Sequence, residues 1–143
     1  MFKHILLPTD GSDPTMRAIN TAIKLAAQLG ARIHALHVLT PLPAVSFIAD
    51  VLQGDIYRKQ ACERAETNLA KVREMAHAVN VVCDVEYLFD NRPYVAIAGA
   101  ATKYHCDLIV MDAHECNNIE RLLLSNTTHK VILSCDVPVL VCH

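Results

Sequence analysis

The sequence has no tryptophan, only 4 glycines in 143 residues, and no long uninterrupted apolar run. Because the apolar runs are short, and Pro138 interrupts the one at 137–142, we expect no membrane-spanning segment. The first eight residues lack the long apolar stretch and the small-residue cleavage site of a signal peptide, so we expect a cytoplasmic protein. The 13 basic and 15 acidic side chains form no block of one sign. Without a basic footprint, we expect no nucleic-acid partner.

The six cysteines include no Cys-x-x-Cys pair. An even number of cysteines suggests disulfides in a small secreted chain, but 52% of this chain is hydrophobic and we expect no export signal. Four cysteines lie beside or within apolar periodic segments, where cysteine behaves as a small hydrophobic residue. We interpret these four as buried, reduced thiols: Cys62, Cys83, Cys106 and Cys135.

Short apolar segments alternate with segments of helical periodicity. The apolar segments predict strands at 4–8, 33–39, 81–89, 108–111 and 137–142. The periodic segments predict helices from a cap at Ser12 or Asp13 to Gly30, over 55–79, from the turn at 91–93 to about 105, and over 126–134. The connection at 42–54 has no assigned structure.

This alternation predicts the fold class. Strands that are apolar on both faces need helices above and below, which favours a parallel sheet. Right-handed crossovers then favour a doubly wound α/β sheet, and no repeat or linker divides the chain. We therefore expect a single domain over residues 1–143. Ligands of such sheets bind beyond the carboxyl ends of the strands, here at 9–12 and 112–116, with Val38 at the same rim.

The chain resembles the universal stress proteins along its whole length. The resemblance rests on five segments: 5–12 (ILLPTDGS), 36–38 (LHV), 107–111 (DLIVM), 121–126 (RLLLSN) and 137–141 (VPVLV). It implies a Rossmann-like sheet of order 3-2-1-4-5 and a non-enzymatic, homodimeric stress-resistance protein. In the family the last strands often pair across a two-fold axis, which implies an interface here at Val137, Pro138, Val139, Leu140 and Val141.

Family members that bind ATP resemble one another in a glycine motif after the fourth strand: Gly-x-x-Gly, nine residues, then Gly-Ser or Gly-Thr. Glycines there let backbone N–H groups approach the phosphates. The matching positions of this chain are Asp112, Glu115, Ser125 and Asn126, so we expect a degraded ATP site without a bound cofactor. Pro8, Asp10 and Val38 match the adenine and ribose end of the family site, which leaves an adenine-nucleotide sensor as the alternative. The residues expected to contact any nucleotide are Pro8, Thr9, Asp10, Val38, Met111, Asp112, Ser125 and Asn126.

A second alternative is a metal-responsive binder that uses the loop 112–116. His114 and Cys116 are potential zinc ligands, but the loop has no paired-ligand spacing, so we assign no metal site. We also expect no catalytic residue and no enzyme activity. The chain has no Gly-x-Ser-x-Gly elbow and no P-loop lysine.

Overall fold

The computed structural model describes residues 1–13, 15–41, 49–113 and 127–143. These residues form one parallel sheet in the order β3-β2-β1-β4-β5, which confirms the predicted fold class and strand order. The strands are β1 (His4–Pro8), β2 (Arg32–Leu39), β3 (Cys83–Phe89), β4 (Leu108–Asp112) and β5 (Val139–Cys142). The helices are α1 (Thr15–Leu29), α2 (Ala49–His77), α3 (Pro93–Lys103) and α4 (Thr127–Ser134).

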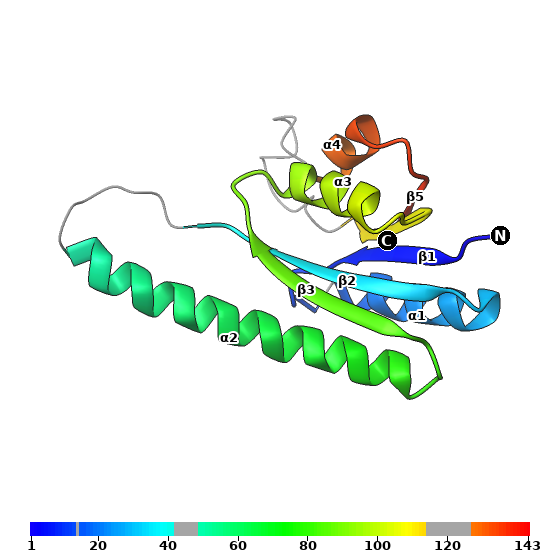
Figure 1. Ribbon diagram of the computed structural model, residues 1–143, viewed down its shortest axis with the longest axis horizontal. Coiled ribbons are helices and arrows are strands. Elements are labelled where there is room, and N and C mark those ends of the chain that lie inside the picture. Colours follow the sequence, from blue (N-terminus) through cyan, green and yellow to red (C-terminus); the bar gives the residue numbers. More distant parts are fainter. Residues whose placement is uncertain (14, 42–48, 114–126) are drawn as a thin grey trace.

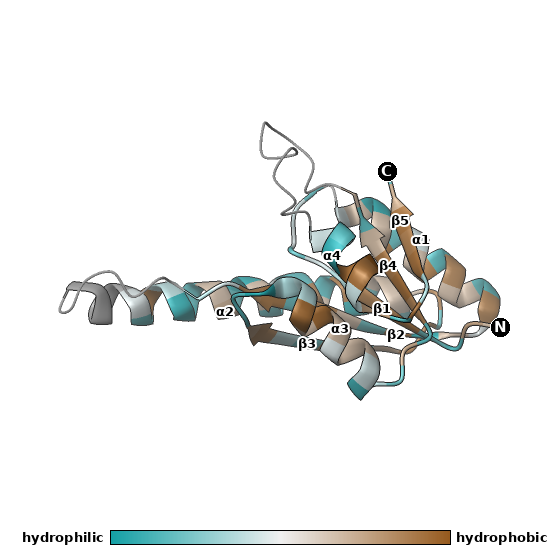
Figure 2. Cartoon of the chain, turned by 90° about the horizontal axis from the view of Figure 1, so that it is seen from above, coloured by the Kyte–Doolittle hydropathy of each residue, from teal (hydrophilic) through white to brown (hydrophobic). Residues whose placement is uncertain are grey.

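Helices cover both faces of the sheet. Helices α1 and α2 lie against one face, and α3 and α4 lie against the other (Figure 1). The central strand β1 shows why two layers of helices are needed, since Ile5, Leu6 and Leu7 are all 0% exposed although successive side chains point to opposite faces. The apolar strands lie inside this three-layer arrangement, with polar residues on the outer helix surfaces (Figure 2).

Several element boundaries differ from the predicted ones, among them the starts of β5, β3 and α2. Strand β5 begins at Val139 rather than at 137, and the carbonyl of Pro138 accepts a hydrogen bond from the N–H of Ile109. Proline has no N–H to donate, so it stands just ahead of the strand. Strand β3 begins at Cys83 rather than at 81, after a turn in which Asn80 has a φ of 60°. Helix α2 begins at Ala49, earlier than the predicted 55, and projects beyond the end of the sheet (Figure 1).

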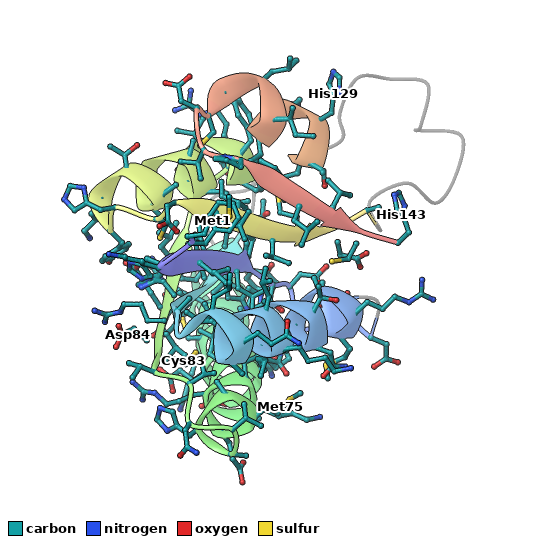
Figure 3. All side chains as sticks on the ribbon, turned by 90° about the vertical axis from the view of Figure 1, so that its right-hand side faces the viewer. Met1, Met75, Cys83, Asp84, His129 and His143 are labelled. Atoms are coloured by element: carbon teal, nitrogen blue, oxygen red, sulfur yellow. The ribbon has the colours of Figure 1, made fainter. Side chains whose placement is uncertain are left out.

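Two of the four cysteines predicted to be buried are buried. Cys83 and Cys106 are 2% and 5% exposed, while Cys62 and Cys135 are partly exposed, so the prediction was wrong for the second pair. Cys83 lies in the layer between β3 and α2, to which Met75 also contributes (Figure 3). The described cysteines are free thiols. Among the described helices, none has both the length and the apolar character needed to cross a membrane.

Candidate ligand crevice

A crevice of about 240 Å³ opens at the carboxyl edge of the sheet. It lies where the winding reverses, because β1 has β2 on one side and β4 on the other. The first residues of α1, α3 and α4 reach the same place, so three helix N-termini border the crevice. The described lining is Pro8, Thr9, Asp10, Thr15, Leu36, Val38, Thr40, Pro93, Ile97, Met111, Asp112, Thr127 and Thr128.

One side of the crevice is apolar. Strand β2 contributes Leu36 and Val38, and the first turns of α3 contribute Pro93 and Ile97. Leu36 and Ile97 belong to the same buried cluster as Leu6 and Met111, so the core holds this wall in place. A rigid apolar wall suits the flat face of a ring compound.

The turn between β1 and α1 holds Asp10 at the rim. The backbone N–H of Ser12 donates to Oδ1 of Asp10 at 2.8 Å, which is the Asx turn that an aspartate favours here. The N–H of Gly11 donates to Oγ1 of Thr9 at 3.2 Å, and Gly11 has a φ of +77°, a conformation that favours glycine. Asp10 is therefore fixed by its own turn, with Oδ2 left for other partners.

The predicted side-chain cap of α1 does not form as expected. The carbonyl of Ser12 accepts bonds from the N–H and Oγ1 of Thr15, but Oγ of Ser12 is buried and has no hydrogen-bond partner among the described residues. The carbonyl of Asp13 accepts the N–H of Met16. Backbone carbonyls, rather than the predicted side chains, make these first contacts of the helix.

The other side of the crevice is acidic and hydroxyl-rich. Asp112 ends β4, and its main-chain oxygen accepts a hydrogen bond from Oγ1 of Thr128 at 3.2 Å. The Oδ2 atom of Asp112 is buried and has no hydrogen-bond partner among the described residues. No lysine, arginine or histidine is present in the described lining. Three helix N-termini, each equivalent to about half a positive charge, only partly offset the two carboxylates of Asp10 and Asp112.

His37 lies in β2 with its side chain on the sheet face opposite the crevice. Its neighbours Leu36 and Val38 point into the crevice, and side chains alternate along a strand. His37 is 7% exposed, and its Nδ1 atom has no hydrogen-bond partner among the described residues. Burial lowers the pKa of His37 from its usual 6.5, while the attraction of Asp10 acts in the opposite direction.

Six of the eight residues predicted to contact a nucleotide line this one crevice: Pro8, Thr9, Asp10, Val38, Met111 and Asp112. Ser125 and Asn126 lie outside the described residues. The residues predicted to contact a ligand did not include Thr15, Pro93 and Thr127, the first residues of three helices, which also line the crevice. The helices of a doubly wound sheet begin at its carboxyl edge. The first helix residue after each predicted turn could therefore have been predicted to line the crevice.

The proposed metal loop lies mostly outside the described residues, because His114, Glu115 and Cys116 are not among them. In the described ranges, no three His, Cys, Asp or Glu side chains form a group able to hold a metal ion. His129 of α4 and His143 after β5 lie on the same side of the molecule (Figure 3). The metal alternative stays a prediction.

The sheet order and the crevice at its reversal point define a doubly wound α/β protein with an open crevice at the carboxyl edge of the sheet. The universal stress protein family matches residues 1–143, and the chain belongs to this family. A universal stress protein of Thermus aquaticus is 36% identical over 141 residues, 98% of each chain. The universal stress protein MJ0531 of Methanocaldococcus jannaschii is 33% identical over 99% of this chain and 82% of its own. A universal stress protein solved in complex with cAMP has a TM-score of 0.77 at 24% identity, over 99% of this chain and 97% of its own.

Proposed function

We propose that this chain is a non-enzymatic stress-resistance protein that acts as a homodimer in the cytoplasm, through protein contacts, and does not retain ATP. The observation that carries the proposal is the carboxylate of Asp112, at a position where ATP-binding relatives have glycine, in a crevice whose described lining has no cationic side chain. The proposal of non-enzymatic action rests on the sequence, which has neither a Gly-x-Ser-x-Gly elbow nor a P-loop lysine.

The repulsion is large enough to matter. A carboxylate ~5 Å from a phosphate oxygen, at an effective dielectric near 20, costs roughly 3 kcal/mol before screening. That is about a hundredfold in affinity for each such contact. The sequence adds a second obstacle, because Asp112, Glu115, Ser125 and Asn126 stand where ATP-binding relatives have glycines or the Ser/Thr after them. Side chains at these positions also keep the backbone away from the phosphates.

The homodimer is proposed at the β5 edge of the sheet. The other edge, β3, carries the charged residues Asp84 and Glu86, which discourage pairing with another strand. Strand β5 has only apolar residues, from Val139 to Cys142, and Leu140 is 39% exposed. An apolar edge strand without a charge favours pairing with a second copy. The expected contact residues are Val137 and Pro138 ahead of the strand, and Val139, Leu140 and Val141 within it.

Two measurements on the purified, untagged chain test the proposal. The first is the ultraviolet spectrum with chromatography of whatever heat releases, together with titration calorimetry against ATP. With no tryptophan and 4 tyrosines, the protein absorbs weakly, so a bound adenine is readily detected. We expect no released nucleotide and no tight ATP binding. Stoichiometric ATP would overturn the degraded-site proposal, and an increased affinity in the double variant Asp112→Gly, Glu115→Gly would support it.

The second measurement is the molar mass in solution by light scattering. We expect a dimer for the natural chain and a shift toward monomer for Leu140→Lys, which places a charge on the exposed β5 edge. Val82→Lys is the matched control, because Val82 is 58% exposed just before β3, the opposite edge strand. A monomeric natural chain, or equal effects of the two substitutions, would overturn the proposed interface.

The second candidate function is an adenine-nucleotide sensor. It is favoured by the open crevice, which brings Pro8, Asp10 and Val38 together beside the apolar wall. The related structure with bound cAMP supports the same reading of the site. Calorimetry separates the candidates, since a sensor requires affinity for a nucleotide phosphate and the primary proposal requires that phosphates weaken binding.

A further inference from the structure

His37 is a buried titratable side chain with an incomplete set of hydrogen bonds. It is 7% exposed, and its Nδ1 atom has no hydrogen-bond partner among the described residues. Its side chain lies on the sheet face covered by α1 and α2, the face that Ile33 and Ala35 of the same strand also occupy. A neutral imidazole donates through one nitrogen, whereas an imidazolium donates through both and carries a charge that burial penalises. Protonation of His37 therefore requires an acceptor that the neutral ring does not need.

The titratable groups around His37 come from β3, from α2 and from the end of β1. Strand β3 places Tyr87 beside His37 in register, and the Tyr87 hydroxyl donates to Oε1 of Glu66 in α2 at 3.1 Å. Hydrogen bonds to Cys62 and to Glu66 raise the pKa of Tyr87, so its hydroxyl stays protonated. The buried residues of α1 are uncharged. Among the described residues, Asp10 after β1 is the charged group that acts on the pKa of His37, and its attraction favours the imidazolium.

The Asp10 carboxylate already holds the turn between β1 and α1. Its Oδ1 atom accepts the backbone N–H of Ser12 at 2.8 Å. The start of this turn is joined to the strand of His37, because the N–H of Thr9 donates to the carbonyl of Leu36 at 2.9 Å. The turn and the imidazole therefore both interact with Asp10, and a protonated His37 competes with the N–H of Ser12 for the carboxylate.

We propose that protonation of His37 opens the turn at 9–12 and thereby changes the rim of the crevice on acidification. While His37 is neutral, Asp10 accepts the N–H of Ser12 and the turn is closed. When His37 is protonated, the carboxylate shifts toward the imidazolium, and the N–H of Ser12 loses its acceptor. Because Asp10 also lines the crevice, the shape of the rim then depends on pH. The change needs no ligand, so the inference does not depend on whether the crevice binds a nucleotide.

The change occurs on the acidic side of pH 6.5. Burial lowers the pKa of His37 from 6.5, and the attraction of Asp10 acts in the opposite direction. The folded chain therefore holds a neutral His37 at neutral pH and takes up the proton as the pH falls through the lowered pKa. The turn is closed above that range and open below it, which is the direction expected of a device that responds to acid.

The test is an NMR titration of the full chain from about pH 7.5 to about pH 4.5. It follows the ring of His37 and the backbone N–H of Ser12 in the same samples. We expect both signals to change with one midpoint, below pH 6.5. Hydrogen exchange at the N–H of Ser12, corrected for the intrinsic rate at each pH, should become roughly fivefold faster or more as the turn opens. This comparison within the natural chain does not require any variant to fold.

Two variants identify the groups responsible. In His37→Gln, the N–H of Ser12 should keep its protection through the midpoint found for the natural chain, because glutamine does not titrate. In Asp10→Asn, the amide oxygen still accepts the N–H of Ser12 but attracts no proton to His37. The pKa of His37 should then fall further, and the turn should stay closed at the pH where the natural turn opens. His77→Gln is the matched control, an exposed histidine at the end of α2, and should leave both titrations unchanged.

Three outcomes would overturn the inference. If the N–H of Ser12 exchanges no faster where His37 is protonated, the turn does not open. If the turn still opens in His37→Gln with the same midpoint, another group is responsible. If the His37 ring stays neutral down to the pH at which the chain unfolds, the turn has no trigger. None of these results concerns ATP or the homodimer, so each leaves the proposed function as it stands.

Discussion

The Nε2 atom of His34 lies 3.2 Å from the Oε2 atom of Glu86, between the sheet and the C-terminal end of α3. The same carboxylate oxygen accepts the hydroxyl of Tyr104 at 2.8 Å, and the His34 and Tyr104 rings are stacked with centroids 3.9 Å apart. His34 is 5% exposed, so its polar atoms have little access to water. Glu86 therefore joins β2 to the end of α3 through two polar side chains.

Replacing Glu86 with alanine should destabilise the fold by about 2 kcal/mol, because it leaves a buried imidazole and a phenol without their acceptor. Glu86→Gln should cost less, since its amide oxygen still accepts one bond. Asp84→Ala is the matched control on the same strand. Asp84 pairs with Arg32 at a half-exposed site, where an ion pair contributes about 0–1 kcal/mol. Urea unfolding of the three variants measures these values, and equal losses for Glu86→Ala and Asp84→Ala would contradict the assignment.

Gly11 and Gly30 show two different physical reasons why a position favours glycine. Both have positive φ, +77° and +64°, but a Cβ on Gly11 would collide with the Asn68 side chain of α2, whereas one on Gly30 meets nothing within 4 Å. Gly30→Ala should cost about 1 kcal/mol from backbone strain alone. Gly11→Ala should cost more, and adding Asn68→Ala should remove the excess.

Thermal and urea unfolding measure the free energy of unfolding of each of these variants. The informative quantity is the difference between Gly11→Ala in the natural background and in the Asn68→Ala background. Equal values in the two backgrounds would show that Asn68 moves aside without cost, and the collision would then have no role in fixing the turn.

Histidine 37 should make stability depend on pH. Burial lowers the pKa of His37 from 6.5, so below pH 6.5 the unfolded chain takes up a proton that the folded chain takes up only at lower pH. Stability is therefore unaffected by this group above pH 6.5 and falls as the pH decreases from there to the folded-state pKa. The attraction of Asp10 raises the pKa and limits the loss. In His37→Val, urea unfolding should show a shallower loss of stability on acidification.

His77→Gln is the control for that experiment, because His77 is exposed at the end of α2. Its pH profile should follow that of the natural chain. Some acid sensitivity should remain in His37→Val, since burial also lowers the pKa of His4. If the dependence of stability on pH is unchanged in His37→Val, the pKa of His37 does not differ between the folded and the unfolded chain.

The sheet could be predicted from the sequence, because strands such as β1 are apolar on both faces and permit few other arrangements. The sequence was also sufficient for the residues directly after strand ends, Asp10 and Asp112, which line the crevice as their positions predict. It was insufficient for contacts between distant elements. The contacts of Glu86 with His34 and Tyr104 depend on where the end of α3 lies, which no local pattern specifies. The close approach of the Asn68 side chain to Gly11 depends in the same way on the position of α2. Partial exposure of Cys62 was missed for the same reason.

The two cysteines that are buried among the described residues should be nearly inert. Burial raises the pKa of Cys83 and of Cys106 from 9.0 to about 11, so each has roughly 100-fold less thiolate at pH 8 than an unperturbed cysteine. We expect iodoacetamide to label the partly exposed Cys62, Cys135 and Cys142 of the native chain well before these two. Peptide mass mapping over time measures the rates, with the urea-unfolded chain as the control in which the differences disappear. Early labelling of Cys83 or Cys106 in the native chain would mean that β3 or the turn before β4 opens readily, because the closed fold exposes neither sulfur to the reagent.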